Sequence, residues 1–163
     1  MKRDYTQIGQ TLDRAISASM SRDERMSVFV DVLWPVLSPA SVSWLGFYSR
    51  ESGADEMILE ARRDKPACSP IGMHGACGQS CVTKTTLIVT DVANLGEGYI
   101  ACDPRDLSEL VIPLVCEAGE CWGTYDADSF ERGAFDERDA DEMLGLLVAT
   151  GLTTASSLPV CIV

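Results

Sequence analysis

The feature that most restricts the fold of this chain is a hydrophobic hairpin in its second half. Two stretches, 109–116 (ELVIPLVC) and 121–130 (CWGTYDADSF), flank the short turn EAGE at 117–120. Strands joined by so short a turn pair antiparallel, because a parallel connection needs a dozen or more residues. Three further stretches fit strands, at 41–50, 56–62 and 86–92. The sequence therefore predicts a mainly antiparallel sheet.

Helices are predicted at both ends of the chain. Apolar residues recur at helical spacing over 5–16, and Ser21 with Glu24 forms a capping box for a second helix that should stop near Pro35. The stretch 135–152 predicts a terminal amphipathic helix with Asp136 as its N-cap. We therefore expect the α/β (α+β) class, with a central antiparallel sheet flanked by N- and C-terminal helices.

Composition excludes several classes of protein. The chain has 163 residues, 46% of them hydrophobic, which is enough to build the core of one domain and argues against disorder. Net charge is −12 without a basic run, so neither a nucleic acid nor an anionic membrane is an expected partner. No apolar stretch is long enough for a membrane span, and no signal peptide is recognisable. A cytoplasmic location is therefore expected, where thiols stay mostly reduced.

The seven cysteines divide by their setting. Three lie in or beside two long loops, 62–75 and 93–108, where a thiol can be exposed enough to react: Cys68, Cys77 and Cys102. Nearby thiols allow one thiolate to attack and a second thiol to resolve the product. The other four are expected to be small buried apolar residues: Cys81, Cys116, Cys121 and Cys161.

A structural zinc site is the competing interpretation of the cysteines. Cys77 with Cys81, and Cys116 with Cys121, have nearly the spacing of paired zinc ligands, and His74 lies close to Cys77. However, the second pair stands at the facing ends of the hairpin, where small apolar residues are common. The sequence therefore favours no metal ligand.

Three acidic residues belong to the same hairpin. Glu109 and Asp128 lie almost symmetrically about the turn, and Asp126 shares a face with Asp128 because side chains alternate along a strand. Crowded, buried carboxylates repel one another and have raised pKa values, so one can stay protonated near neutral pH. Such an acid can donate a proton, and the others can hold a cation. The alternative is a solvated acidic rim.

Several motifs together resemble the free methionine-R-sulfoxide reductases, a family of stand-alone GAF-domain enzymes. They are SWLGFY (43–48), KPAC (65–68), GACG (75–78), DV (91–92), IACD (100–103), SEL before VIPL (108–114) and DADSF (126–130). They occur in the order of the family and cover about residues 40 to 130. The resemblance implies a GAF-like antiparallel sheet flanked by helices, in a single domain over 1–163. The sequence departs from the family at Asp64, in place of Gly, and at Tyr99, in place of His.

The resemblance implies a thiol-dependent reaction without a bound cofactor. The family reduces the R-epimer of free methionine sulfoxide to methionine, usually with thioredoxin and NADPH as external reductants. Cys102 matches the nucleophile that becomes a sulfenic acid, Cys68 the thiol that forms a disulfide with it, and Cys77 a third cysteine that assists recycling.

The family also implies a substrate pocket and a homodimer. The acids match groups that contact the sulfoxide and support its protonation: Glu109, Asp126 and Asp128. Trp44 and Tyr48 match aromatic residues that line the substrate pocket, although aromatic residues on a strand are often part of the core.

Two other classes of protein fit parts of the sequence. A non-catalytic GAF sensor would bind a small ligand without depending on Cys102. A structural metal protein would purify with stoichiometric zinc. Turnover of free methionine-R-sulfoxide separates both from a reductase.

Overall fold

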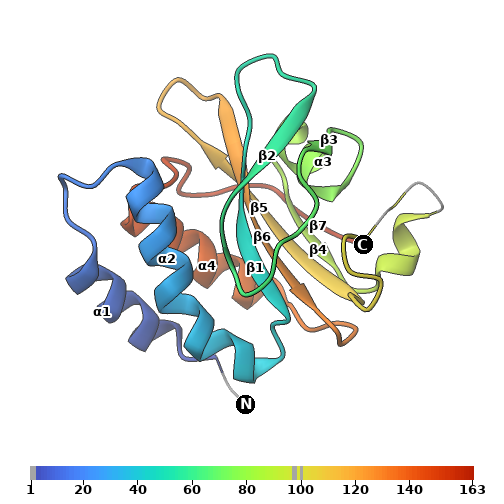
Figure 1. The fold of residues 1–163 in the computed structure, drawn as a ribbon, viewed down its shortest axis with the longest axis horizontal. Helices are drawn as coiled ribbons and strands as arrows, with labels where there is room; N and C mark the ends of the chain where they lie inside the picture. The colour runs from blue at the N-terminus through green and yellow to red at the C-terminus, as the bar shows by residue number, and fades with distance from the viewer. Residues whose placement is uncertain (1–2, 97–98, 100) are drawn as a thin grey trace.

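The computed structural model describes residues 3–96, 99 and 101–163 (Figure 1). Ile100 of the IACD motif, and residues 97 and 98 of the loop expected over 93–108, lie outside the described residues. The elements in chain order are α1 (Tyr5–Ala15), α2 (Arg22–Leu37), η1 (Ser38–Ala40), β1 (Trp44–Ser49), β2 (Glu56–Arg63), β3 (Ile71–Gly72), α3 (Ala76–Thr83), β4 (Thr86–Val89), η2 (Val92–Leu95), β5 (Ser108–Val115), β6 (Cys121–Ser129), α4 (Glu137–Ala149) and β7 (Val160–Ile162).

The predicted α+β architecture is confirmed. The strands form one sheet in the order β3-β2-β1-β6-β5-β4-β7. All neighbouring strands pair antiparallel except β4 and β7, which are parallel. The central hairpin is β5 and β6, and Gly119 in its turn has a φ of 80°, a left-handed conformation that favours glycine. None of the helices within the described ranges is long and apolar enough to cross a membrane.

Two helices, α2 and α4, cover one face of the sheet, and α1 packs on their outer side (Figure 1). Their N-termini begin where the sequence provides caps: Asp4 for α1, and capping boxes from Ser21 with Glu24 and from Asp136 with Asp139. The apolar sides of the helices pack on alternate residues of the central strands. An edge-to-face aromatic group lies at the centre, with 5.5 Å between the ring centroids of Phe29 and Phe47.

The opposite face carries a smaller apolar cluster under α3. This cluster includes Trp44, Tyr48, Cys77, Cys81 and Val111. The helix approaches the chain before it very closely: a Cβ at Gly78 would lie 2.3 Å from the Met73 backbone. Only glycine therefore fits at this position of the GACG motif.

Two predictions about the ends of elements are wrong. The second helix does not stop near Pro35 but includes it and continues to Leu37. Pro35 removes only the hydrogen bond to the Asp31 carbonyl, and the burial of Leu37 offsets that loss. The helix over 137–149 is also not the last element, because β7 follows it and pairs with β4 at the sheet edge.

The four cysteines expected to be buried fall into three groups. Cys81 is buried, as predicted, whereas Cys116 and Cys121 at the hairpin ends are only half-buried. The prediction for Cys161 is wrong: it is exposed on β7, because nothing in the described part of the chain covers this edge strand.

Candidate active site

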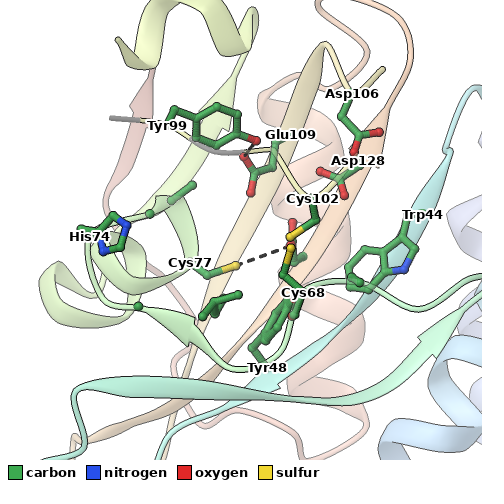
Figure 2. Close-up of a pocket in the computed structure, with 16 residues that line it drawn as sticks. Trp44, Tyr48, Cys68, His74, Cys77, Tyr99, Cys102, Asp106, Glu109 and Asp128 are labelled. Carbon is green, nitrogen blue, oxygen red and sulfur yellow. Dashed lines mark hydrogen bonds between the residues drawn. The ribbon is translucent and has the colours of Figure 1, made fainter. Parts of the chain in front are cut away.

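A cavity of about 250 Å³ opens on the face of the sheet opposite α1, α2 and α4. It is lined by all eight residues that the sequence singled out: Trp44, Tyr48, Cys68, Cys77, Cys102, Glu109, Asp126 and Asp128. Figure 2 shows their side chains converging from the strands, from α3 and from two loops. Its size and mixed apolar and polar lining are typical of a site for a small molecule.

The strand register places the three acids. Glu109 on β5 lies directly opposite Asp128 on β6, as the symmetry of the hairpin predicted. Asp126, two residues before Asp128, points to the same face. The carboxylates therefore come together because β5 and β6 are paired in one fixed register.

The aromatic wall belongs to β1, the neighbour of β6. Trp44 lies opposite Asp128, and Gly46 lies opposite Asp126. A Cβ at Gly46 would come within 2.5 Å of the Trp44 ring, so the glycine leaves the space into which the indole folds. Trp44 and Tyr48 then stand beside each other, with 6.2 Å between their ring centroids.

Two loops carry the exposed thiols to the cavity mouth. Lys65, before Cys68, forms an ion pair with Asp103, which follows Cys102. Arg105 also holds the Asp103 carboxylate at 2.7 Å. The Cys68 loop is fixed to the sheet as well, because the Tyr48 hydroxyl donates to its carbonyl at 2.9 Å. As a result the thiols of Cys68 and Cys102, both exposed residues, lie within hydrogen-bonding reach of each other (Figure 2).

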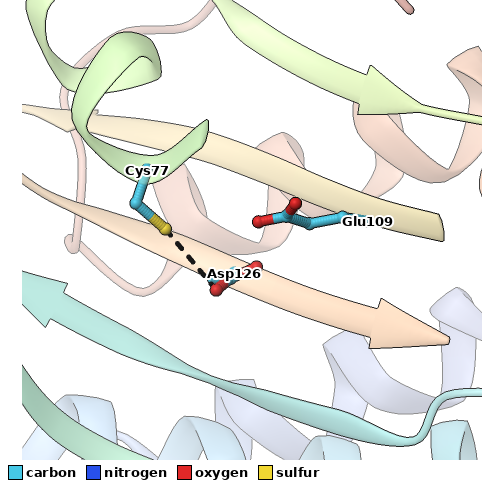
Figure 3. A group of neighbouring side chains, drawn as sticks. All are labelled: Cys77, Glu109 and Asp126. Atoms are coloured by element: carbon cyan, nitrogen blue, oxygen red, sulfur yellow. Dashed lines mark hydrogen bonds between the residues drawn. The ribbon is translucent and has the colours of Figure 1, made fainter. Parts of the chain in front are cut away.

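Cys77 differs from the prediction of an exposed loop thiol. It lies in the first turn of α3, is 5% exposed, and donates to Asp126 Oδ2 at 3.5 Å (Figure 3). Burial, followed by the charge of Asp126, raises the pKa of this thiol well above its ordinary value. In the substrate-free pocket Cys77 is therefore a neutral hydrogen-bond donor.

Glu109 and Asp126 are buried, and neither forms an ion pair within the described ranges. Desolvation raises the pKa of Glu109 to about 7, although hydrogen bonds from Tyr99 and with Asp126 lower it. Desolvation and the Glu109 charge raise the pKa of Asp126 well above its ordinary range. One oxygen of Asp126, Oδ1, is buried and has no hydrogen-bond partner among the described residues. The pair therefore holds at least one proton near neutral pH.

Asp128 is half-buried at the same wall. Desolvation, then the charges of Asp126 and Glu109, raises its pKa well above the ordinary value. A positively charged ligand group here would remove this repulsion. The three carboxylates can therefore supply a proton, bind a cation, or do both.

Besides His74, two further polar residues line the cavity that the motif reasoning did not assign to it. The Tyr99 hydroxyl donates to Glu109 Oε2 at 3.1 Å. Asp106 is 5% exposed and accepts from the Ser43 hydroxyl at 3.1 Å. Both lie in the loop before β5, where no periodicity indicates which side chains turn inward.

The nucleophile predicted from the resemblance is protonated in this setting. Partial desolvation of the thiol at the cavity mouth is the largest cause, followed by the hydrogen bond with Cys68, and together they raise the pKa of Cys102 to about 12. Nearby Asp126 acts in the same direction. Formation of a thiolate here therefore requires a group that accepts the proton as the reaction proceeds.

Three side chains in the cavity carry atoms that could bind a metal ion. Cys77, Glu109 and Asp126 each offer one ligand atom, and these atoms lie within 4.8 Å of one another (Figure 3). A metal ion would have to displace the protons that burial favours on Cys77 and Asp126. The zinc pairs considered from the sequence do not meet a third donor at such distances within the described ranges.

Comparison with known proteins agrees on the fold. A solved structure of a GAF domain superimposes with a TM-score of 0.81 and 27% identity, covering 91% of this chain and 86% of the other. The free methionine-R-sulfoxide reductase of Neisseria meningitidis, solved with its substrate, gives a TM-score of 0.81 at 28% identity over 93% and 89% of the two chains. The architecture is thus a GAF fold. No protein-family model matches the sequence.

Sequence comparison finds relatives among the GAF-domain proteins. The chain is 37% identical to the free methionine-R-sulfoxide reductase of Saccharomyces cerevisiae over 102 residues, which are 61% of this chain. The match spans 56% of the length of that relative. The chain therefore shares the GAF fold and is similar in sequence to the free methionine-R-sulfoxide reductases.

Proposed function

We propose that the protein reduces free L-methionine-(R)-sulfoxide to methionine. The observation that carries this proposal is the cavity in which two adjacent thiols face a group of carboxyls that holds at least one proton. The names of the relatives support the same substrate, and the N. meningitidis structure contains its substrate. In the proposed complex, Asp126, Asp128 and Glu109 hold the sulfoxide oxygen and the ammonium, and Trp44 and Tyr48 enclose the side chain.

The first step consumes one thiol and one sulfoxide. Cys102 Sγ attacks the sulfoxide sulfur while a carboxyl of the acid group donates a proton to the oxygen, which is otherwise a poor leaving group. The Cys102 proton replaces the one that the acids gave. In the adduct the Cys102 sulfur is bonded to the methionine sulfur, which carries the protonated oxygen; the hydroxyl then passes to Cys102 Sγ as the S–O bond and the S–S bond break, so methionine leaves and Cys102 becomes a sulfenic acid. This proton exchange explains how a thiol with a pKa of about 12 can act as nucleophile.

The second step uses the neighbouring thiol. Cys68 Sγ attacks the sulfenic sulfur, a Cys68–Cys102 disulfide forms, and water leaves. Thioredoxin, itself reduced by NADPH and thioredoxin reductase, then returns both thiols by disulfide exchange. Cys77 lies close enough to the acids to assist this recycling. We further propose that residues 1–163 act as one GAF-like domain, assembled as a homodimer in the cytoplasm without a bound cofactor.

A coupled assay tests the proposal. NADPH consumption is followed with thioredoxin and its reductase, on the R-epimer and the S-epimer of free methionine sulfoxide in parallel. The R-epimer should be turned over; activity with the S-epimer alone, or with neither, contradicts the proposal. A GAF sensor would instead bind a ligand without turnover.

Cysteine variants test the order of the thiols. Cys102→Ser should abolish turnover, because no other residue is placed as the nucleophile. Cys68→Ser should still release one equivalent of methionine, but its recycling by thioredoxin should be slower. Normal turnover by Cys102→Ser would remove the role assigned to Cys102.

A further inference from the structure

We propose that Cys81 and Cys121 form a second redox dithiol, which hydrogen peroxide converts into a disulfide between α3 and β6. Neither residue lines the cavity described above. The proposal therefore stands independently of the proposed reductase activity.

The two thiols are held against each other by packed elements. Cys81 lies in the second turn of α3, and Cys121 is the first residue of β6; both belong to the apolar cluster under α3. Cys81 Sγ approaches the Cys121 carbonyl oxygen at 3.7 Å, and the two thiols lie within hydrogen-bonding reach. A disulfide can form from this arrangement when the two side chains rotate to bring the sulfurs to bonding distance.

The surroundings assign different roles to the two sulfurs. The hydrogen bond from Cys121, and the nearby cations Arg50 and Lys84, lower the pKa of Cys81 to about 7 against the effect of burial. The same contact with Cys81, and burial, raise the pKa of Cys121 above its ordinary value. This contact favours the proton on Cys121, so we assign Cys81 as the attacking sulfur and Cys121 as the resolving sulfur. The pKa of Cys81 is thus lowered, whereas in the cavity desolvation and the nearby Asp126 raise the pKa of Cys102 and keep it protonated.

The chemistry balances with peroxide as the oxidant. The Cys81 thiolate attacks one peroxide oxygen, the O–O bond breaks, and Cys81 becomes a sulfenic acid while hydroxide leaves. Cys121 then attacks the sulfenic sulfur, the disulfide forms, and water leaves. Both sulfurs are oxidised, and one peroxide is reduced to two molecules of water. The half-buried position of Cys121 at the hairpin end gives a small oxidant a route to the pair.

The disulfide would connect to the cavity through α3. Cys81 follows Cys77 by four residues, so both lie on one side of the helix. Cys77 contacts Asp126 on β6, and Cys121 begins the same strand. Oxidation of the second pair would therefore fix the helix that carries Cys77 onto the strand that carries Asp126.

The experiment is peptide mapping of the full-length protein after peroxide treatment. Native protein is treated with hydrogen peroxide, unreacted thiols are blocked with iodoacetamide under denaturing conditions, and the digest is analysed by mass spectrometry. We use wild type and the Cys68→Ser/Cys102→Ser double variant, in which the cavity disulfide cannot form. Both should contain a peptide linked through Cys81 and Cys121, with complete loss of alkylation at these two positions.

Two single variants, made in the same double-variant background, sharpen the test. Cys121→Ser should leave Cys81 as a sulfenic acid that reacts with dimedone, while Cys116→Ser, at the other end of the hairpin, should still form the Cys81–Cys121 disulfide. Full alkylation of Cys81 and Cys121 in peroxide-treated wild type overturns the proposal. So does a product in which either cysteine is linked to Cys77, Cys116 or Cys161 instead. The wild-type result decides the question even if a variant fails to fold.

Discussion

Successive side chains of β6 lie in two opposite environments. Tyr125 and Ala127 pack among α1, α2 and α4 in the apolar core, whereas Asp126 and Asp128 line the cavity on the other face. The alternation continues on β5, where Leu110 and its alternate neighbours join the core and Glu109 faces the cavity. The same two strands thus supply packing to one face and titratable groups to the other.

Burial of side chains has opposite effects on stability at the two faces of the sheet. On the helix face, burial of large apolar side chains is the main stabilising contribution. On the cavity face, burial of carboxylates is unfavourable and raises their pKa values. Substitutions on the helix face should therefore change stability, and substitutions on the cavity face should change chemistry.

Amide variants of the acids should give the largest effect. If a carboxyl donates the proton in the first step, its replacement should slow the chemical step by roughly 10²- to 10⁴-fold, because the amide cannot transfer it. The variants are Glu109→Gln, Asp126→Asn and Asp128→Asn, each nearly the size of the wild-type residue. Single-turnover methionine release measures the step directly.

The same variants separate two roles within the cavity face. An acid that only holds the substrate ammonium should raise KM with less effect on kcat, provided that chemistry limits turnover. Wild-type kinetics in all three variants would mean that the acids are a solvated rim and that the proton has another source.

Truncation on the helix face should show the opposite behaviour. Phe29→Ala removes a fully buried ring that contacts Phe47 and Tyr125, with centroid distances of 5.5 and 5.8 Å. We expect a loss of about 3–5 kcal/mol in the free energy of unfolding. Turnover per folded molecule should stay near that of wild type. Urea unfolding and active-site titration measure the two quantities, and a large fall in turnover of the folded fraction would break the contrast between the faces.

The pH dependence of stability tests the cost of burying Glu109. Burial raises its pKa from 4.5 to about 7, so the folded state holds this proton more tightly than the unfolded state does. The stability that Glu109 contributes is present below about pH 4.5 and is lost as pH rises through about 7. Over this window the wild-type protein should lose on the order of 3 kcal/mol through Glu109.

Glu109→Gln should remove this part of the pH dependence. Free energies of unfolding from urea titrations at about pH 5 and about pH 8 should fall less in the variant than in wild type. The Glu109 charge also raises the pKa values of Asp126 and Asp128, so its removal should flatten their contribution as well. An equal slope in both proteins would show that Glu109 is not titrating in this range.

The site residues that stand on the strands could be predicted from the sequence, because side chains alternate regularly along a strand. The short turn predicts that β5 pairs with β6, and a register shift between Leu114 and Val115 completes the pairing that places Glu109 opposite Asp128. The alternation of side chains likewise predicts that Trp44 and Tyr48 share a face. The GAF class followed from the ordered motifs, and the solved structures agree with it.

The loops of the site and the strand β7 could not be predicted, because their positions depend on contacts between segments that lie far apart in the sequence. Lys65 and Asp103 decide how the two loops meet, and nothing in their local sequence indicates that pair. Tyr99 and Asp106 turn inward from a loop without periodicity. The three-residue strand β7 is too short to give a pattern, so neither its pairing with β4 nor the exposure of Cys161 could be foreseen.

The smallest expected effect concerns a polar atom on the helix face. The Tyr125 hydroxyl is fully buried and has no hydrogen-bond partner in the part of the chain that the structure describes. Tyr125→Phe removes this unsatisfied group and should raise the free energy of unfolding by about 1 kcal/mol. Tyr5→Phe is the matched control, because the Tyr5 hydroxyl donates to Asp139 at 2.6 Å and its loss should destabilise the protein by a similar amount. Urea unfolding of both variants should therefore give shifts of opposite sign with unchanged activity. If both variants lose stability, the Tyr125 hydroxyl has a partner such as a buried water, and the helix face is less strictly apolar than the comparison of the two faces requires.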